Sequence, residues 1–425
     1  MTTATLRRVD GLAIAKQRCN AVDDDALRVA RAIVERVRCD GEPALRALAE
    51  RFGERENGDA LVLDRSAIER GADCAPADVV ALLRRAASRI GAFAVQQRDA
   101  IVEVRASYPW GQAGHTIEPV ASAGCYAPGG RFPLVSSALM TAIPARIAGV
   151  DRVALASPNP SAAMLAAALV ADVDEVLCVG GAHAVAALAY GCAGLAPCDI
   201  VVGPGNRFVT AAKHVVSRDV GVDMLAGPSE LLILADDSAE SSIIAADLLA
   251  QAEHDPEATP MLITTSAEQA THVEAQLEAQ GATLPTWTTA RAALANGWCA
   301  IAGDLDEAIA WANATAAEHV QVMTRDAAGV ARRVKHAGAV FIGGASAVAL
   351  GDYGAGPNHT LPTGGAARFA AGLSIATFLR LRTWMSVEQG DEASALARDA
   401  AALARLEGLE AHARAVERRI VAGTC

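Results

Sequence analysis

The sequence has few of the features that mark several classes of protein. Aromatic residues make up only 4% of its 425 residues. Its nine cysteines are scattered without a Cys-x-x-Cys pair, which is not the spacing of a disulfide framework. Basic residues are outnumbered, and the formal net charge of −12 argues against nucleic-acid or membrane partners, because both need a basic surface. These absences favour a cytoplasmic protein that acts on a small molecule.

Apolar runs long enough for a membrane are almost absent as well. Residues 176–198 carry no formal charge and could span a bilayer by length. Gly180, Gly181 and Pro197 interrupt this segment, so we interpret it as a strand, a glycine turn and a helix of a buried core. The apolar run 11–15 is too short for a signal-peptide core.

The pattern that is present is an alternation of strands and helices. At 52% apolar residues the chain can form a large core, and its length predicts more than one domain. The alternation is typical of βαβ units on a parallel sheet. Strands are predicted at 152–156, 175–179, 200–202, 231–235, 261–264, 299–302, 320–323 and 340–342, which gives two sheets. Helices are predicted over two stretches of 23–52 and along the tail 391–421, whereas 101–120 is predicted as an extended linker.

Glycine turns follow two of the predicted strands, and a third such turn follows a short extended piece. They are Gly180-Gly181, Gly203-Pro204-Gly205-Asn206 and Gly227-Pro228-Ser229-Glu230. Ligands of parallel sheets bind at the carboxyl ends of the strands, where helix starts offer free N–H groups. Phe208 stands where the third glycine of Gly-x-Gly-x-x-Gly would be, so the standard dinucleotide motif is missing. Tight turns without any ligand remain an equal alternative.

Gln251 and His254 are the first candidate metal ligands. They are three residues apart on a predicted helix and share one face, although a solvated helix end has the same composition. Asp352, His412 and the pair Glu318-His319 supply further ligand types. Two imidazoles, a carboxylate and an amide oxygen suit zinc, followed by manganese or cobalt. Because these residues come from separate segments, their spacing leaves open whether they meet.

Six motifs, in order, resemble the histidinol dehydrogenase family over nearly the whole chain. They are residues 203–206, 227–230, 246–254, 318–319, 351–353 with 358–363, and 407–412. The resemblance implies an α/β fold with two Rossmann-like parallel-sheet domains and terminal segments that exchange in a homodimer. The implied domains are a segment 1–21, a zinc and substrate domain 22–103 with 229–373, a cofactor domain 104–228, and a tail 374–425 that reaches the partner subunit.

The same resemblance implies a reaction and a site. Enzymes of the family oxidise a primary alcohol through an aldehyde to an acid with NAD, and L-histidinol is the expected substrate. One zinc ion per subunit would be held by Gln251, His254, Asp352 and His412. His319 would take the hydroxyl proton and Glu318 would activate water. The implied substrate residues are Ser229, Gln251, His254, His319, Asp352, His359, Glu407 and His412, and the implied cofactor residues are Tyr126, His183 and Asn206.

Three departures qualify the resemblance. His183 replaces a cofactor-binding glutamine, residues 315–323 lack the usual Tyr-x-Pro and Leu-Glu around Glu-His, and residues 346–350 lack Pro-Glu. Residues 128–133, 318–326 and 358–363 look more like the sulfopropanediol dehydrogenases, a branch of the family. The alternative is therefore another small polar alcohol or an anionic diol paired with Arg131. A metal-dependent hydrolase or lyase is the alternative from a different class.

Overall fold

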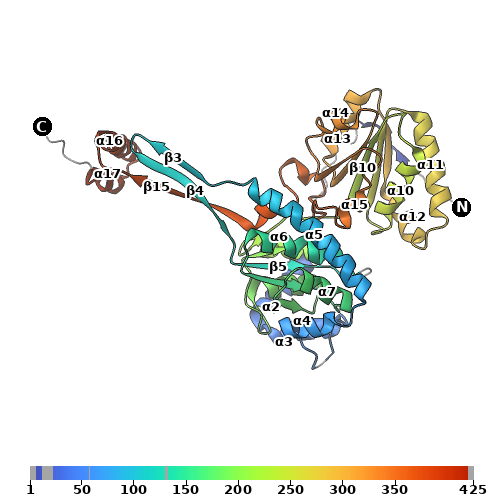
Figure 1. The fold of residues 1–425 in the computed structure, drawn as a ribbon, viewed down its shortest axis with the longest axis horizontal. Coiled ribbons are helices and arrows are strands. Elements are labelled where there is room, and N and C mark those ends of the chain that lie inside the picture. Colours follow the sequence, from blue (N-terminus) through green and yellow to red (C-terminus); the bar gives the residue numbers. More distant parts are fainter. Residues whose placement is uncertain (1–5, 12–22, 57, 130–132, 420–425) are drawn as a thin grey trace. The chain divides into compact units, whose positions relative to one another are not determined.

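The chain forms two compact units. A computed structural model describes residues 6–11, 23–56, 58–129 and 133–419 (Figure 1). Most of the predicted segment 1–21, and Arg131, lie outside the described residues. The first unit contains residues 1–97 and 120–378, and the second contains 98–119 and 379–425. Among the described residues, no helix is long and apolar enough to cross a membrane.

The first unit contains a six-stranded sheet in the order β2-β7-β6-β5-β8-β9. Its strands are β2 (Val62–Leu63), β5 (Ser122–Tyr126), β6 (Arg152–Ala156), β7 (Glu175–Leu177), β8 (Ile200–Val202) and β9 (Gly221–Val222). All neighbours are parallel except β2 and β7. The strand order reverses between β5 and β8, which is where such sheets form a ligand crevice.

A second six-stranded sheet in the same unit has the order β1-β12-β11-β10-β13-β14. Its strands are β1 (Arg7–Arg8), β10 (Glu230–Ala235), β11 (Thr259–Thr264), β12 (Trp298–Ile301), β13 (His319–Met323) and β14 (Ala339–Ile342). All of its neighbouring strands are parallel. The strand order repeats that of the first sheet, with the reversal between β10 and β13. The predicted α/β architecture with parallel sheets is confirmed.

Helices cover both faces of each sheet. They are α2 (Asp24–Asp40), α3 (Glu42–Arg51), α4 (Arg65–Ala72), α5 (Ala77–Asp99), α6 (Val135–Ala148), α7 (Ala162–Val170), α8 (Gly181–Tyr190), α9 (Arg207–Val216), α10 (Ser241–Ala252), α11 (Ala267–Gly281), α12 (Trp287–Asn296), α13 (Leu305–Thr315), α14 (Ala327–Ala331) and α15 (Val348–Asp352). Helices α10 to α12 share a core on one face of the second sheet, and α13 and α14 share a core on the other. Helix α8 is built mainly of alanine and is almost wholly buried, as a helix without a polar face must be.

The amino-terminal helices pack on the first sheet. Asp23 caps α2 by accepting a hydrogen bond from the Ala26 backbone, and the apolar face of α2 contacts α8 and α9. Helix α4 contacts α7, and β2 pairs with β7. Helices α2 and α4 therefore pack against helices of the first sheet, and β2 is one of its strands. The predicted assignment of functions to the domains stays a prediction.

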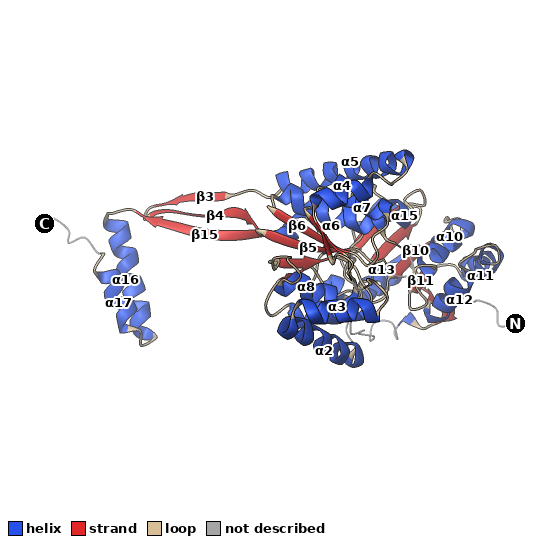
Figure 2. Ribbon diagram, turned by 90° about the horizontal axis from the view of Figure 1, so that it is seen from below, coloured by secondary structure: helices blue, strands red, loops and turns tan. Residues whose placement is uncertain are grey.

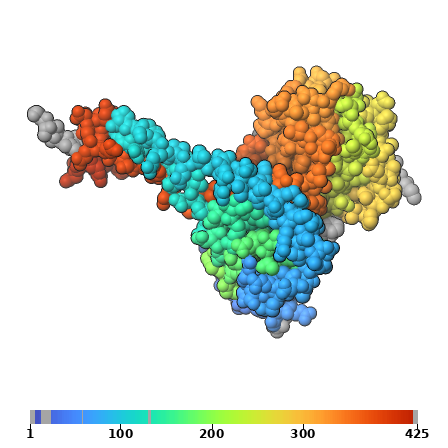
Figure 3. All heavy atoms as spheres, in the orientation of Figure 1, coloured from blue at the N-terminus to red at the C-terminus, as the bar shows by residue number. Residues whose placement is uncertain are grey.

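The second unit is an antiparallel ribbon with two helices. Strands β3 (Val104–Tyr108), β4 (Gly111–Pro119) and β15 (Leu379–Val387) lie in the order β15-β4-β3 and are followed by α16 (Asp391–Leu406) and α17 (Glu410–Glu417) (Figure 2). The prediction of a linker over 101–120 was therefore wrong, because this segment forms a hairpin. The single predicted tail helix is two helices, broken at Gly408, which has a positive φ of 78°. In Figure 3 the cyan hairpin and the red tail lie together in this unit.

Candidate active site

The Glu318-His319 pair lies at the start of β13, beside the start of β10. Leu231 of β10 is in register with His319, so Glu230 is adjacent to Glu318. This is the amino end of both parallel strands, whereas ligands of such sheets usually bind at the carboxyl ends. The candidate catalytic residues therefore lie on the opposite edge of the second sheet from the one that the strand rule favours.

Glu230 connects this edge to a distant loop. Its backbone N–H donates to Glu318 Oε2 at 2.8 Å, and the Glu318 N–H donates to Glu230 Oε2 at 3.3 Å. The Gly364 N–H donates to Glu230 Oε1 at 3.0 Å. Burial, followed by the charge of Glu318, raises the pKa of the Glu230 carboxyl to about 7. Glu230 lies in the motif 227–230, but no local sequence pattern indicates a role for it.

His319 is held so that one ring nitrogen remains unpaired. Its Nδ1 lies 3.0 Å from the Glu230 carbonyl oxygen and must donate, because a carbonyl only accepts. Its Nε2 is buried, has no hydrogen-bond partner among the described residues, and lies 3.9 Å from Asp352 Oδ1. Burial alone would lower the pKa of His319, but the carboxylates of Glu318 and Asp352 raise it to about 9. The second nitrogen is thus the one available for proton transfer.

The long glycine-rich loop after Asp352 is fixed by specific bonds. His359 Nδ1 donates to the Asp352 carbonyl at 3.0 Å, and its Nε2 lies 3.3 Å from Ser137 Oγ. Burial lowers the pKa of His359, which favours the neutral ring. Asn358 Nδ2 donates to the Met140 carbonyl at 2.6 Å. The predicted functional loop is therefore held against α6 by hydrogen bonds.

Three of the four predicted zinc ligands, Gln251, His254 and Asp352, belong to the first unit. Gln251 is buried in the last turn of α10, His254 follows it, and α10 contacts α15, which ends at Asp352. The burial of Gln251 argues against the solvated helix end for this residue. An amide oxygen, an imidazole and a carboxylate fit zinc with one position left for a further ligand. No group of three or more His, Cys, Asp or Glu able to hold a metal occurs in the described part of the chain.

The remaining predicted ligand comes from the second unit. His412 lies on α17 and is exposed, and the predicted substrate residue Glu407 lies exposed at the end of α16. Ser229, also predicted to bind substrate, is half-buried and lies immediately before β10. The predicted contribution of Glu407 and His412 to a partner's site stays a prediction.

Tyr126 and Asn206 lie on either side of the reversal in the first sheet. Tyr126 ends β5, and its hydroxyl accepts a hydrogen bond from the Gly181 N–H at 3.0 Å. Burial raises the pKa of Tyr126 to about 12, so the hydroxyl keeps its proton. Asn206 follows β8 and caps α9 by accepting from the backbone of Phe208 and Val209. Both residues are where a crevice for a nucleotide is expected in this fold.

His183 makes an internal pair in the first turn of α8. Its Nε2 lies 2.7 Å from Glu54 Oε2, and its ring stacks on Phe52 at 5.4 Å between centroids. Glu54 Oε1 also accepts from the Gly180 N–H at 3.2 Å. The side chains of Glu54 and Tyr126 thus accept hydrogen bonds from the N–H groups of Gly180 and Gly181 at the start of α8, where the glycine turn offers N–H groups to a ligand. Glu54 had no sequence signal, because its contact with His183 spans 129 positions.

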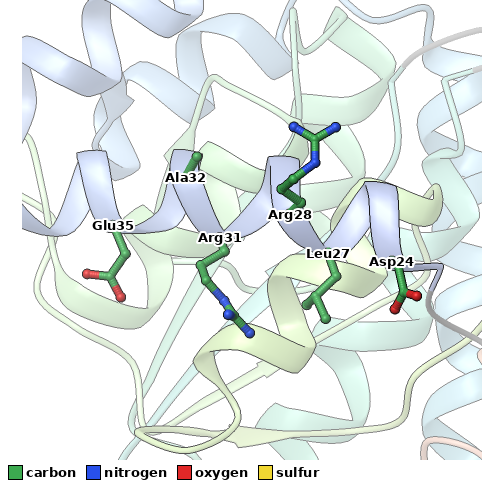
Figure 4. A pocket seen from close by; sticks show the side chains of 6 residues that line it. All are labelled: Asp24, Leu27, Arg28, Arg31, Ala32 and Glu35. Carbon is green, nitrogen blue, oxygen red and sulfur yellow. The ribbon is translucent and has the colours of Figure 1, made fainter.

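Two surface cavities lie away from these residues. One of 350 Å³ is lined by six residues of α2, and Figure 4 shows all six side chains coming from this one helix. The other, of 550 Å³, lies between the end of α4 and the start of α5. Neither is lined by a predicted site residue.

Comparison with known proteins connects this arrangement to one family. A family model described as histidinol dehydrogenase matches residues 16–420. The histidinol dehydrogenase of Natronomonas pharaonis is 42% identical over 93% of this chain and 94% of its own length. That of Halobacterium salinarum is 44% identical over 91% of each chain. The crystal structure of histidinol dehydrogenase from Elizabethkingia anophelis superposes with a TM-score of 0.91 at 28% identity, covering 99% of this chain and 98% of that one.

Proposed function

Because the chain belongs to the histidinol dehydrogenase family, we propose that it is an NAD-dependent oxidoreductase that converts L-histidinol to L-histidine. The observation that supports this best is the arrangement of His319. One ring nitrogen is committed to the Glu230 carbonyl, and the other is unpaired and close to Asp352. Such a base can accept a hydroxyl proton without first breaking another hydrogen bond.

The zinc ion is proposed to be held by Gln251, His254 and Asp352 together with His412 of the partner subunit. When bound, the ion would lower the pKa of the substrate hydroxyl and, beside Asp352, that of His319. This matters because the carboxylates around His319 otherwise favour its protonated form. Tyr126, His183 and Asn206 are proposed to bind NAD, which accepts the hydride when bound.

Two oxidations follow from the residues present. In the first, His319 Nε2 takes the hydroxyl proton while the carbon loses a hydride, which leaves an aldehyde. In the second, Glu318 takes a proton from the water that adds to the aldehyde, and the hydrate anion that remains then loses a second hydride to NAD to give the acid. Ser229 and His359 are proposed to hold the substrate during both steps, together with Glu407 of the partner subunit.

The test uses purified protein, zinc, L-histidinol and NAD. We expect two equivalents of reduced NAD for each histidinol consumed, measured by the absorbance of the reduced cofactor. No turnover of histidinol, with reduction of NAD by another small alcohol or a sulfonated diol, would move the enzyme to the sulfopropanediol branch. An absence of NAD reduction with every alcohol would overturn the proposal in favour of a metal-dependent hydrolase or lyase.

A further inference from the structure

A buried ion pair lies beside the predicted cofactor crevice. Lys213 on α9 pairs with Asp223, which follows β9, and their side chains are only 3% and 0% exposed. Neither residue belongs to a motif that the sequence pointed to. A buried ion pair is costly to form, because both charges lose their hydration. Such a pair at this position calls for a reason beyond stability.

The two charged side chains bind the same glycine. Lys213 Nζ donates to the Gly203 carbonyl at 3.0 Å, and the Gly203 N–H donates to Asp223 Oδ2 at 2.8 Å. Gly203 has a positive φ of 121°, and a side chain there would come within 2.3 Å of the Tyr126 carbonyl oxygen. Only glycine allows this close approach. Because glycine also has the greatest backbone conformational freedom, other contacts must hold its backbone in this conformation. The ion pair supplies that restriction by occupying both polar groups of the residue.

Gly203 is the first residue after β8, at the point where the strand order reverses. It touches Tyr126 on one side and begins the turn that ends at Asn206 on the other. Thr210 Oγ1 on α9 donates to the Ala226 carbonyl at 2.5 Å and ties the same helix to the next loop. The orientation of two predicted cofactor residues therefore depends on how the Gly203 backbone is held.

We propose that Lys213 and Asp223 are positioning residues for NAD. By fixing both polar groups of Gly203, they hold Tyr126 and Asn206 in the geometry that binds the cofactor. Apolar residues could fill the same volume, and such replacements of buried ion pairs are often neutral or even stabilising elsewhere. They could not, however, bind the Gly203 backbone. The inference rests on the proposed NAD-dependent function.

Two double variants separate the hydrogen bonds from the charges. In Lys213→Gln/Asp223→Asn, amide groups can still donate to the Gly203 carbonyl and accept from its N–H without any charge. In Lys213→Met/Asp223→Leu, both bonds are lost at similar volume. We expect the Kd for NAD, measured by calorimetry, to rise at least about tenfold in the Met/Leu protein and no more than about threefold in the Gln/Asn protein. The kcat at saturating NAD and the Kd for histidinol should stay near their wild-type values in both.

Thermal unfolding of each protein is the control, because it shows that every variant is folded when its Kd for NAD is measured. Wild-type NAD affinity in the Met/Leu protein would overturn the proposal, as would equal losses of NAD and histidinol binding, which indicate a purely structural pair. If the Met/Leu protein does not fold, Lys213→Met and Lys213→Gln give the same comparison with Asp223 in place, and an equal Kd for both would overturn it. A wild-type protein that binds no NAD would instead count against the proposed function.

Discussion

Glu318 and His319 are neighbours at the start of β13, and their hydrogen bonds suit different proton transfers. Glu318 Oε2 accepts from the Glu230 N–H, an interaction that the amide of Glu318→Gln can preserve. The amide cannot take a proton from water, so hydration of the aldehyde should slow while the first oxidation continues. In Glu318→Gln we expect the number of reduced NAD molecules formed per histidinol consumed to fall from two towards one. The aldehyde should then accumulate, and a trapping amine can capture it. His319→Gln should lose both oxidations, and an unchanged ratio for Glu318→Gln would contradict the assignment.

The raised pKa of Glu230 predicts how the free energy of unfolding depends on pH. The pKa of its carboxyl is raised from 4.5 to about 7, so the folded protein holds this proton more tightly than the unfolded chain does. The contribution of this carboxyl to the free energy of unfolding is fully present below about pH 4.5 and is lost as the pH rises through 7. Glu230→Gln should remove this loss, so that its unfolding free energy falls by about 2 kcal/mol less than that of the wild type between pH 5 and 7.5.

Denaturant unfolding of zinc-free protein at several pH values measures this difference. The exposed Glu268 on α11 provides the matched control, and Glu268→Gln should follow the wild-type pH dependence. Parallel curves for wild type and Glu230→Gln would show that the Glu230 carboxyl does not titrate in this range. Because its bonds fix Glu318 and Gly364, we also expect a lower kcat for Glu230→Gln.

The carboxyl end of α10 provides the most direct test of the metal site, because Gln251 lies in its last turn and His254 lies two residues beyond its end. His254→Ala removes one imidazole and leaves the buried face of α10 unchanged. We expect zinc content, measured by elemental analysis, and histidine production to be lost together. The Kd for NAD should change little, since its predicted ligands belong to the other sheet. His272→Ala on the exposed face of α11 is the control, and a zinc-free His254→Ala protein that remains active would rule out the metal role.

The central strands could be predicted from the sequence because each is a short apolar run between turns. Strands β6 and β8 begin and end where the pattern placed them. The hairpin of β3 and β4 could not be predicted, since β3 is largely exposed and shows no buried apolar alternation. A strand without a buried face in its own subunit leaves little hydrophobic pattern to detect.

The candidate site was predictable only in part, for a related reason. The spacing of Gln251 and His254 points to both residues, although the structure places His254 two residues beyond the end of α10. Glu230 contacts Glu318 and Gly364 across 88 and 134 positions, and no local pattern encodes such pairs. The carboxyl-end rule points to the edge of the first sheet where Tyr126 and Asn206 lie, whereas Glu318 and His319 lie at the amino end of β13. Motif resemblance supplied what spacing could not.

The second unit exposes several large apolar side chains. Leu381 and Met385 on β15 are 61% and 70% exposed, and Leu406 at the end of α16 is 84% exposed. Exposed apolar groups of this kind are typical of surfaces that a protein partner covers. A second copy of the chain is the expected partner, with the tail carrying Glu407 and His412 into its site.

Mixing two inactive proteins tests whether each active site is shared between subunits. We expect His254→Ala and His412→Ala to be inactive alone, because each lacks one zinc ligand in every site. In a mixed dimer one site combines both changes, while the other takes His254 from one subunit and His412 from its partner and is intact. Unfolding and refolding an equal mixture should therefore restore roughly a quarter of the wild-type activity per subunit, since half of the dimers are mixed and each has one intact site. Mixing without subunit exchange should restore none, and mixed dimers with no activity would place both ligands in the same subunit.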